Sequence, residues 1–199
     1  MNIRSLRDDC ANSGYAFSEG KTVSELDEAW DLALAEAQQR AARAGRRDVA
    51  EYLRLRASND LLRQTGIEWL LNTFTVLAGQ ANRRGASLQI SKENAHRFPV
   101  GNATMVGPLL TLAFGVRALT IEAGWPRSPS DGFVRGGGLA CGRIRHRGKK
   151  SVDDELMLMR SEKGAPRWMV IDNKTDRQSE LLEAGIQKHL TKMLAEDYR

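Results

Sequence analysis

The chain has 199 residues, of which 41% are hydrophobic and 28% are charged. This composition excludes an intrinsically disordered polymer and suits one globular domain or at most two small ones. The net charge of +5 is modest, but it is unevenly distributed: residues 80–150 hold twelve basic and three acidic residues, whereas residues 1–39 hold three basic and eight acidic ones. A basic middle segment of this kind suits a polyanion partner, a solvated face or an internal match to the acidic N-terminal part.

Neither membrane insertion nor a disulfide framework is indicated. The two cysteines, Cys10 and Cys141, have no metal-site or disulfide spacing. Residues 1–20 lack the apolar core of a signal peptide. The longest apolar stretch, 105–116, is interrupted by a proline and two glycines and falls short of the roughly 20 residues that a membrane span needs. We therefore expect a soluble, cytoplasmic protein without a membrane partner.

The first predicted helix follows an irregular segment. Residues 1–21 mix small polar and apolar residues without a period, and we expect a flexible arm there. Thr22 and Glu25 form a capping box, after which apolar residues recur every three or four positions. Acidic residues crowd the start of this helix and arginines its end, as the helix dipole favours. Gly45 is a suitable stop.

A second, longer helix is expected from Asp48 to about residue 84, with a break near 58–59 and Gly85 as its C-cap. Since the link between the two helices is short, residues 22–85 should pack as an antiparallel hairpin. The second helix carries a broad apolar stripe. The stripe also predicts a homodimer formed through the hairpin.

Beyond Gly85 the pattern changes from helical periodicity to short apolar runs separated by Gly, Pro and Asn, which is typical of strands and turns. The turns are too short for crossover helices, so the strands should pair antiparallel. A last helix is expected at 176–197, where Thr175 and Gln178 form another box-like start. The predicted class is α+β with five or six strands, at about 87–92, 102–112, 116–123, 139–147, 154–160 and 167–172.

The most basic strand is the first candidate site. In a strand at 139–147, Arg143, Arg145 and Arg147 point to one face and Ile144 to the other. Three guanidiniums about 7 Å apart suit successive phosphates of a nucleic acid, and Lys149 and Lys150 extend the row. The alternative is a solvated face whose arginines pair with acidic residues of the first helix.

A loop at 124–138 is the second candidate. It is long for a segment without structure of its own and contains aromatic and charged residues, which are common in binding loops. The alternative is a surface loop whose aromatic residues pack onto the sheet, with glycines that permit a bulge. The candidate binding residues are Trp125, Arg127, Asp131, Phe133 and Arg135.

Asp154 opens one predicted strand, and Asp172 and Lys174 stand at the end of the next. This third pattern resembles the metal-dependent nucleases of the PD-(D/E)xK type. The resemblance implies carboxylates that hold Mg²⁺ and a lysine that orients the attacking water. No proline precedes Asp154 and no strand follows the last helix, which departs from the family pattern. The alternative is that these residues are strand starts, turns and helix caps.

No other catalytic or cofactor pattern is present. His96, His146 and His189 lack metal-site spacing, and we expect His189 at a boundary or on the surface. There is no phosphate loop, dinucleotide fingerprint or serine elbow, so no cofactor and no resident metal are expected. The leading hypothesis is a non-enzymatic binding or assembly module that contacts nucleic acid through its basic face. The alternatives are the Mg²⁺-dependent nuclease and a small-molecule binder with Trp125 or Trp168 as a pocket wall.

Overall fold

The computed structural model describes residues 22–172 and 177–195, with only the backbone described for residues 22–28, 30 and 31. The arm predicted at 1–21 lies outside these residues. The elements are α1 (Thr22–Arg43), α2 (Arg47–Arg83), β1 (Gln89–Val100), β2 (Ala103–Phe114), β3 (Arg117–Gly124), β4 (Ala140–His146), β5 (Asp154–Arg160), β6 (Pro166–Asp172), β7 (Arg177–Glu180) and α3 (Glu183–Leu194), with two single 3₁₀ turns, η1 (Pro129–Asp131) and η2 (Lys150–Val152).

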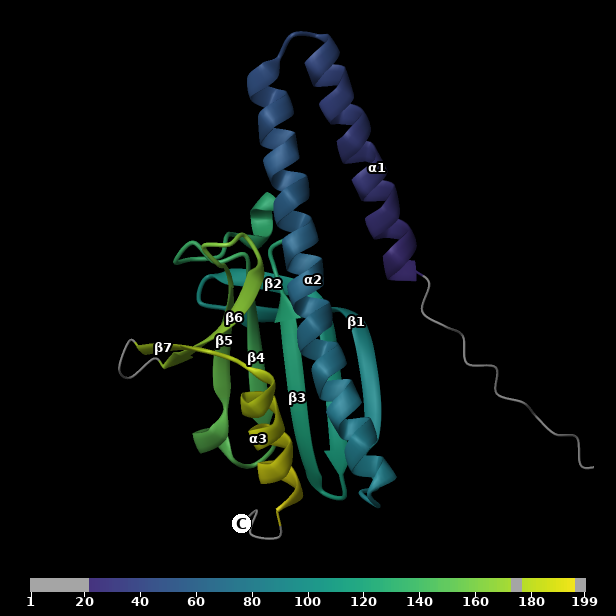
Figure 1. The fold of residues 1–199 in the computed structure, drawn as a ribbon, viewed down its shortest axis with the longest axis vertical. Helices are drawn as coiled ribbons and strands as arrows, with labels where there is room; N and C mark the ends of the chain where they lie inside the picture. Colours follow the sequence, from purple (N-terminus) through teal and green to yellow (C-terminus); the bar gives the residue numbers. More distant parts are fainter. Residues whose placement is uncertain (1–21, 173–176, 196–199) are drawn as a thin grey trace, which may run out of the picture.

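The two N-terminal helices form the predicted hairpin, and α2 alone continues across the sheet (Figure 1). Gly45 adopts a φ of 71° in the link, a conformation that glycine accepts without steric cost. At the other end of α2, Asn82 accepts a hydrogen bond from the Leu88 amide and donates one to its carbonyl, at 2.7 and 2.9 Å. These two bonds fix the reversal from α2 into β1. The break predicted near residues 58–59 is wrong, since α2 is continuous from Arg47 to Arg83.

The strands form one antiparallel sheet in sequence order, β1 to β7. The connections from β1 through β6 are turns or loops without a crossover helix, as the sequence predicts for this half of the chain. In the part of the chain that the structure describes, the sheet has seven strands instead of five or six. Of the helices described, α2 and α3 both lie on the same face of the sheet (Figure 1). We call this the covered face and the opposite side the open face.

The covered face holds the main apolar core. Its strands contribute Leu110, Leu112, Leu119, Ile121 and Leu158, each at most 1% exposed, at alternating positions that point toward the helices. The helices contribute the buried stripe of α2, together with Ile186, Leu190 and Met193 from α3. Burying this continuous surface is what holds the helices on the sheet.

Gly66 lies where α2 packs tightly against β5. A Cβ atom there would lie 2.6 Å from the buried Leu158 side chain, so a larger residue would force a shift at this contact. The Trp168 indole N–H donates to the Gly66 carbonyl at 2.7 Å, although Trp168 is only 2% exposed. The contact joins β6 to the middle of α2 and satisfies a buried donor.

Two predictions at the edges of the sheet, one of a strand end and one of a helix start, are corrected by the structure. β1 continues to Val100 through a polar segment that the sequence pattern ended at residue 92. The segment is exposed along most of its length because β1 is an edge strand, and so apolar alternation is absent. At the other edge, Gln178 belongs to β7 and not to a helix start, and α3 begins at Glu183 instead of 176. Thr175 lies outside the described residues.

No helix among the described residues is long and apolar enough to cross a membrane.

Candidate functional site

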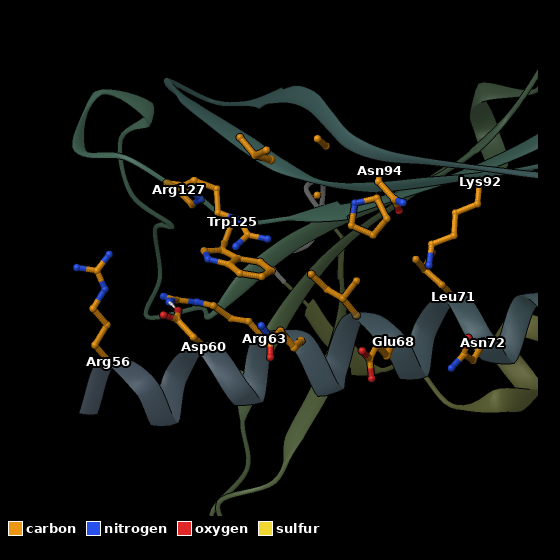
Figure 2. A pocket seen from close by; sticks show the side chains of 17 residues that line it. Arg56, Asp60, Arg63, Glu68, Leu71, Asn72, Lys92, Asn94, Trp125 and Arg127 are labelled. Atoms are coloured by element: carbon orange, nitrogen blue, oxygen red, sulfur yellow. Dashed lines mark hydrogen bonds and ion pairs between the residues drawn. The ribbon is translucent and has the colours of Figure 1, made fainter. Parts of the chain in front are cut away.

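A cleft of about 490 Å³ lies on the covered face between α2, the middle of β1 and β2, and the segment that follows β3 (Figure 2). We call it the α2 cleft. Its apolar wall consists of Ile67 and Leu71 from α2, Val106 and Pro108 from β2, and Trp125. The polar lining consists of Arg56, Asp60, Arg63, Gln64, Glu68, Asn72, Lys92, Asn94 and Arg127. A volume of this size and an apolar wall that faces polar groups are typical of small-molecule sites.

An irregularity in β1 shapes one wall of the cleft. The register of β1 against β2 shifts between Glu93 and His96, which forms a bulge. Ala95 in this bulge has a φ of 59°, in the left-handed region that residues with a Cβ seldom adopt. Asn94 and Ala95 leave the regular ladder and line the cleft. Bulges of this kind often re-aim side chains beside functional sites.

Trp125 holds two arginines at one end of the cleft. The Arg127 guanidinium lies 3.6 Å from the centre of the indole ring and that of Arg63 lies 5.9 Å from it. Figure 2 shows the ring between these two side chains, with its edge turned into the cleft. Trp125 is only 6% exposed and belongs to the main core, so its position is fixed by packing. Cation–π contacts with this fixed indole ring therefore position both guanidiniums.

Arg63 is held by further contacts. Its Nη1 donates to Asp60 at 2.6 Å, and its Nε donates to the Leu139 carbonyl at 2.8 Å. Asp60 is 8% exposed, and this ion pair gives the buried carboxylate a counter-charge. The hydrogen bond from Arg63 to the Leu139 carbonyl also links α2 to the residue that precedes β4.

The positive charges outnumber the negative ones in the cleft lining. The four cations are Arg56, Arg63, Lys92 and Arg127, and the two anions are Asp60 and Glu68. Asp60 forms an ion pair with Arg63. Arg56 and Arg127 lie at the same end as that pair, whereas Glu68 and Lys92 lie toward the other end (Figure 2).

The loop prediction divides into two parts. Trp125 and Arg127 line the α2 cleft, whereas Phe133 is 74% exposed and Arg135 is exposed outside it. Asp131 is buried in η1, where it pairs with Arg97 and accepts a hydrogen bond from the Ser128 hydroxyl at 2.8 Å. This hydrogen bond and Arg97 hold the pKa of Asp131 below its usual value. From this buried position, Asp131 therefore stabilises the conformation of the loop.

Two of the three arginines in the predicted row, Arg143 and Arg145, have the predicted orientation. Ile144 is fully buried on the covered face, whereas Arg143 and Arg145 lie on the open face. β4 ends at His146, so Arg147 follows the strand. Arg145, Arg147 and Lys150 are exposed, whereas Arg143 and Lys149 are partly buried.

Two strand carboxylates accompany the arginines, forming what we call the arginine cluster. Arg143 Nη1 and Arg145 Nε lie 3.5 and 3.7 Å from one oxygen of Glu122. The same two arginines lie 3.1 and 3.9 Å from the oxygens of Glu155. The register explains these contacts, because Arg143 stands directly opposite Glu122 on β3 and Glu155 on β5. Of the acidic residues of the first helix, the alternative partners, Glu36 lies 3.6 Å from Arg40 of the same helix. The side chains of Glu25, Asp27, Glu28 and Asp31 lie outside the described part of the structure.

His96 completes the cluster from β1. Its Nε2 lies 3.0 Å from the second oxygen of Glu122. The strand between them, β2, places Gly107 opposite His96. A Cβ at Gly107 would lie 2.0 Å from the Ala123 carbonyl oxygen, so β2 and β3 approach too closely there for any other residue. Glu122 is only 9% exposed and has a cationic or hydrogen-bonding partner on either side.

A buried pair of histidines joins α3 to the sheet. His146 Nε2 lies 3.0 Å from His189 Nδ1, and His189 Nε2 lies 3.0 Å from the Asp154 carboxylate. The exposures of His146 and His189 are 2% and 5%, so the expectation that His189 lies at a boundary or on the surface is wrong. A carboxylate only accepts hydrogen bonds, so the contact with Asp154 suits a His189 tautomer that donates from Nε2 and accepts from His146 at Nδ1. Burial, assisted by His189 and Lys192, lowers the pKa of His146 to about 4.

Two of the three nuclease-like residues are described. Asp154 and Asp172 begin β5 and end β6, so antiparallel pairing puts them at the same end of neighbouring strands. Asp154 bonds to His189, and Asp172 is paired in register with Arg177 of β7. Lys174 lies outside the described residues. Within 22–172 and 177–195 no group of three or more His, Cys, Asp and Glu side chains is placed to hold a metal ion. The nuclease hypothesis stays a prediction.

Sequence reasoning missed the polar residues of the α2 cleft. Arg56, Asp60 and Arg63 occupy one face of α2 at helical spacing, and nothing in their sequence separates them from an ordinary solvated face. The available signal was Trp125, an aromatic residue directly after a strand in a basic loop. A comparison with protein family models, with curated proteins and with solved structures finds no match for this chain.

Proposed function

We propose that this protein is a non-enzymatic binding module whose ligand is a small organic molecule held in the α2 cleft. The observation that carries the proposal is a cleft of about 490 Å³ walled by the buried ring of Trp125. The main-core residues Ile67 and Leu71 form its apolar side, so the cleft is part of the packed structure. Sites of this kind bury most of a ligand's surface and use a few polar groups to orient it.

The test is a ligand-observed NMR screen of small organic molecules against the wild type and a cleft-filling variant. Gln64 lines the cleft from α2 and is half-buried, so Gln64→Trp places a large side chain inside it. Val76→Trp is the matched control, because Val76 is 55% exposed on the same helix and lies outside the cleft. We expect hits that Gln64→Trp abolishes and Val76→Trp retains. A screen without hits, or hits that survive Gln64→Trp, would contradict the proposal.

Nucleic-acid binding through the basic strand is a second proposal. Its support is that Arg145, Arg147 and Lys150 are exposed next to one another in sequence. The carboxylates of Glu122 and Glu155 weaken it, because they offset the charges of Arg143 and Arg145. Filter binding in low salt should show retention of DNA or RNA that Arg143→Ala with Arg145→Ala reduces. If neither nucleic acid is retained by the wild type, this proposal is wrong.

Self-association through the hairpin is the partner proposal that the exposed apolar residues support. Leu32, Tyr52, Leu55 and Leu61 are 54% to 64% exposed on α1 and α2. Large exposed apolar side chains that gather on one element often mark protein contacts. Sedimentation of the wild type should show a dimer that Leu55→Glu with Leu61→Glu dissociates. A monomeric wild type at high concentration would exclude it.

A further inference from the structure

Cations are concentrated at one end of the α2 cleft. Arg56 and Arg127 lie there beside the Asp60–Arg63 ion pair (Figure 2). Among the described residues that line this end, three carry a guanidinium and one carries a carboxylate. These guanidiniums lie next to the apolar wall formed by Trp125 and Ile67.

The guanidiniums of Arg63 and Arg127 are ordered before any ligand arrives. Arg127 stacks on Trp125 at 3.6 Å, and Arg63 is fixed by Asp60 and the Leu139 carbonyl. Because these contacts immobilise the side chains in advance, less conformational entropy is lost when they bind an anion. Guanidiniums are well suited to carboxylate, sulfonate or phosphate oxygens, which they bind through paired hydrogen bonds.

We infer that the α2 cleft takes an organic anion: a molecule with an apolar body and one anionic group, which is directed at Arg56 and Arg127. The inference rests on the proposed function and adds the chemical class and orientation of the ligand. The apolar body packs against Ile67, Val106, Pro108 and the edge of Trp125. Neither face of the indole is needed for the ligand, since the two guanidiniums lie over the ring.

A matched pair of fluorescent probes tests this inference. The probes are 1-anilinonaphthalene-8-sulfonate and N-phenyl-1-naphthylamine, which share the apolar body and differ in the sulfonate. We expect the sulfonate probe to bind at least about tenfold more tightly, as charge-assisted hydrogen bonds would give. Arg56→Gln with Arg127→Gln should remove this difference and leave the neutral probe's affinity unchanged. Arg135→Gln, a change at an exposed arginine of the same loop, should have no effect.

Arg56→Glu is a second variant that we expect to fold, because Arg56 does not belong to the main core. It should weaken the sulfonate probe more than Arg56→Gln does. Competition by 2-naphthoate and by 1-naphthyl phosphate then distinguishes a carboxylate ligand from a phosphate ligand. Displacement of the sulfonate probe by either competitor supports the inference, and displacement by neither overturns it.

The failures of the two proposals are distinguishable. If both probes bind with equal affinity and Gln64→Trp abolishes both, the cleft is a binding site but the anion inference is wrong. If Gln64→Trp leaves the binding of both probes unchanged, the proposed function itself is wrong.

Discussion

The two faces of the sheet differ in the balance of positive and negative side chains that they carry. On the open face, Arg143 and Arg145 stand among carboxylates of neighbouring strands, so the cluster is close to neutral. On the covered face, the polar groups that interrupt the apolar core include the histidine pair and the lining of the α2 cleft. At the cleft the cations exceed the anions beside an apolar wall. The net charge of a surface therefore depends less on the number of arginines in a segment than on the side chains that the fold places opposite them.

The largest effect is expected from the wall of the cleft. Trp125→Ala removes a ring that is 6% exposed and packs in the main core, so it should lower the free energy of unfolding by about 3–5 kcal/mol. Urea denaturation followed by circular dichroism measures this loss. A change below about 1 kcal/mol would mean that the ring is not packed as described.

The histidine pair should make stability depend on pH. The pKa of His146 is about 4 in the folded protein and near 6.5 in the unfolded chain, so the unfolded state binds the proton more readily. Stability is therefore full above about pH 6.5 and falls as the pH drops toward 4, by an amount on the order of 3 kcal/mol.

Denaturation at several pH values between 7.5 and 4 measures this dependence. His146→Gln should flatten it, and His96→Gln on the open face serves as the matched control. Equal slopes in the wild type and in His146→Gln would show that the buried pair does not titrate in this way.

The open face should respond to charge removal more in binding than in stability. Glu122→Gln with Glu155→Gln removes the carboxylates that accompany Arg143 and Arg145. Two uncompensated arginines should strengthen low-salt binding of single-stranded DNA about tenfold and steepen its salt dependence. Glu162→Gln, an exposed glutamate in the turn before β6, is the control. An unchanged affinity in the double variant would mean that the carboxylates do not mask the row.

The smallest effect is expected from the other aromatic residue of the loop. Phe133 is 74% exposed, so Phe133→Ala should change the free energy of unfolding by less than about 0.5 kcal/mol. It should also leave probe binding in the cleft unchanged. A loss above 1 kcal/mol would place Phe133 in a packed environment and remove the contrast with Trp125.

Much of the fold was predictable because local signals agree with it. The helical period before Gly85 predicts the hairpin, and the short apolar runs and short turns after it predict the antiparallel sheet. β1 beyond residue 92 was missed because an edge strand exposed along most of its length needs no apolar alternation. β7 was missed because its four exposed residues resemble a polar helix start. In both cases pairing with a neighbouring strand prevails over the local pattern.

The candidate site was less predictable, because it joins residues far apart in the chain. Trp125 and Arg127 were candidates from the loop, but their partners Arg63 and Asp60 come from α2. Likewise the alternation on β4 gives the orientation of Arg143 correctly, but its carboxylate partners follow only from strand register.

The most direct measurement is a titration of ¹⁵N-labelled protein with 1-anilinonaphthalene-8-sulfonate, observed at the indole N–H signals of the four tryptophans. Each signal is assigned by a Trp→Phe substitution. If the α2 cleft is the binding site, the Trp125 signal shifts with the probe and the signals of Trp69 and Trp168, which line a different groove beside β6, do not. A shift confined to Trp69 or Trp168, or no shift at saturating probe, would contradict the assignment of the binding site to this cleft.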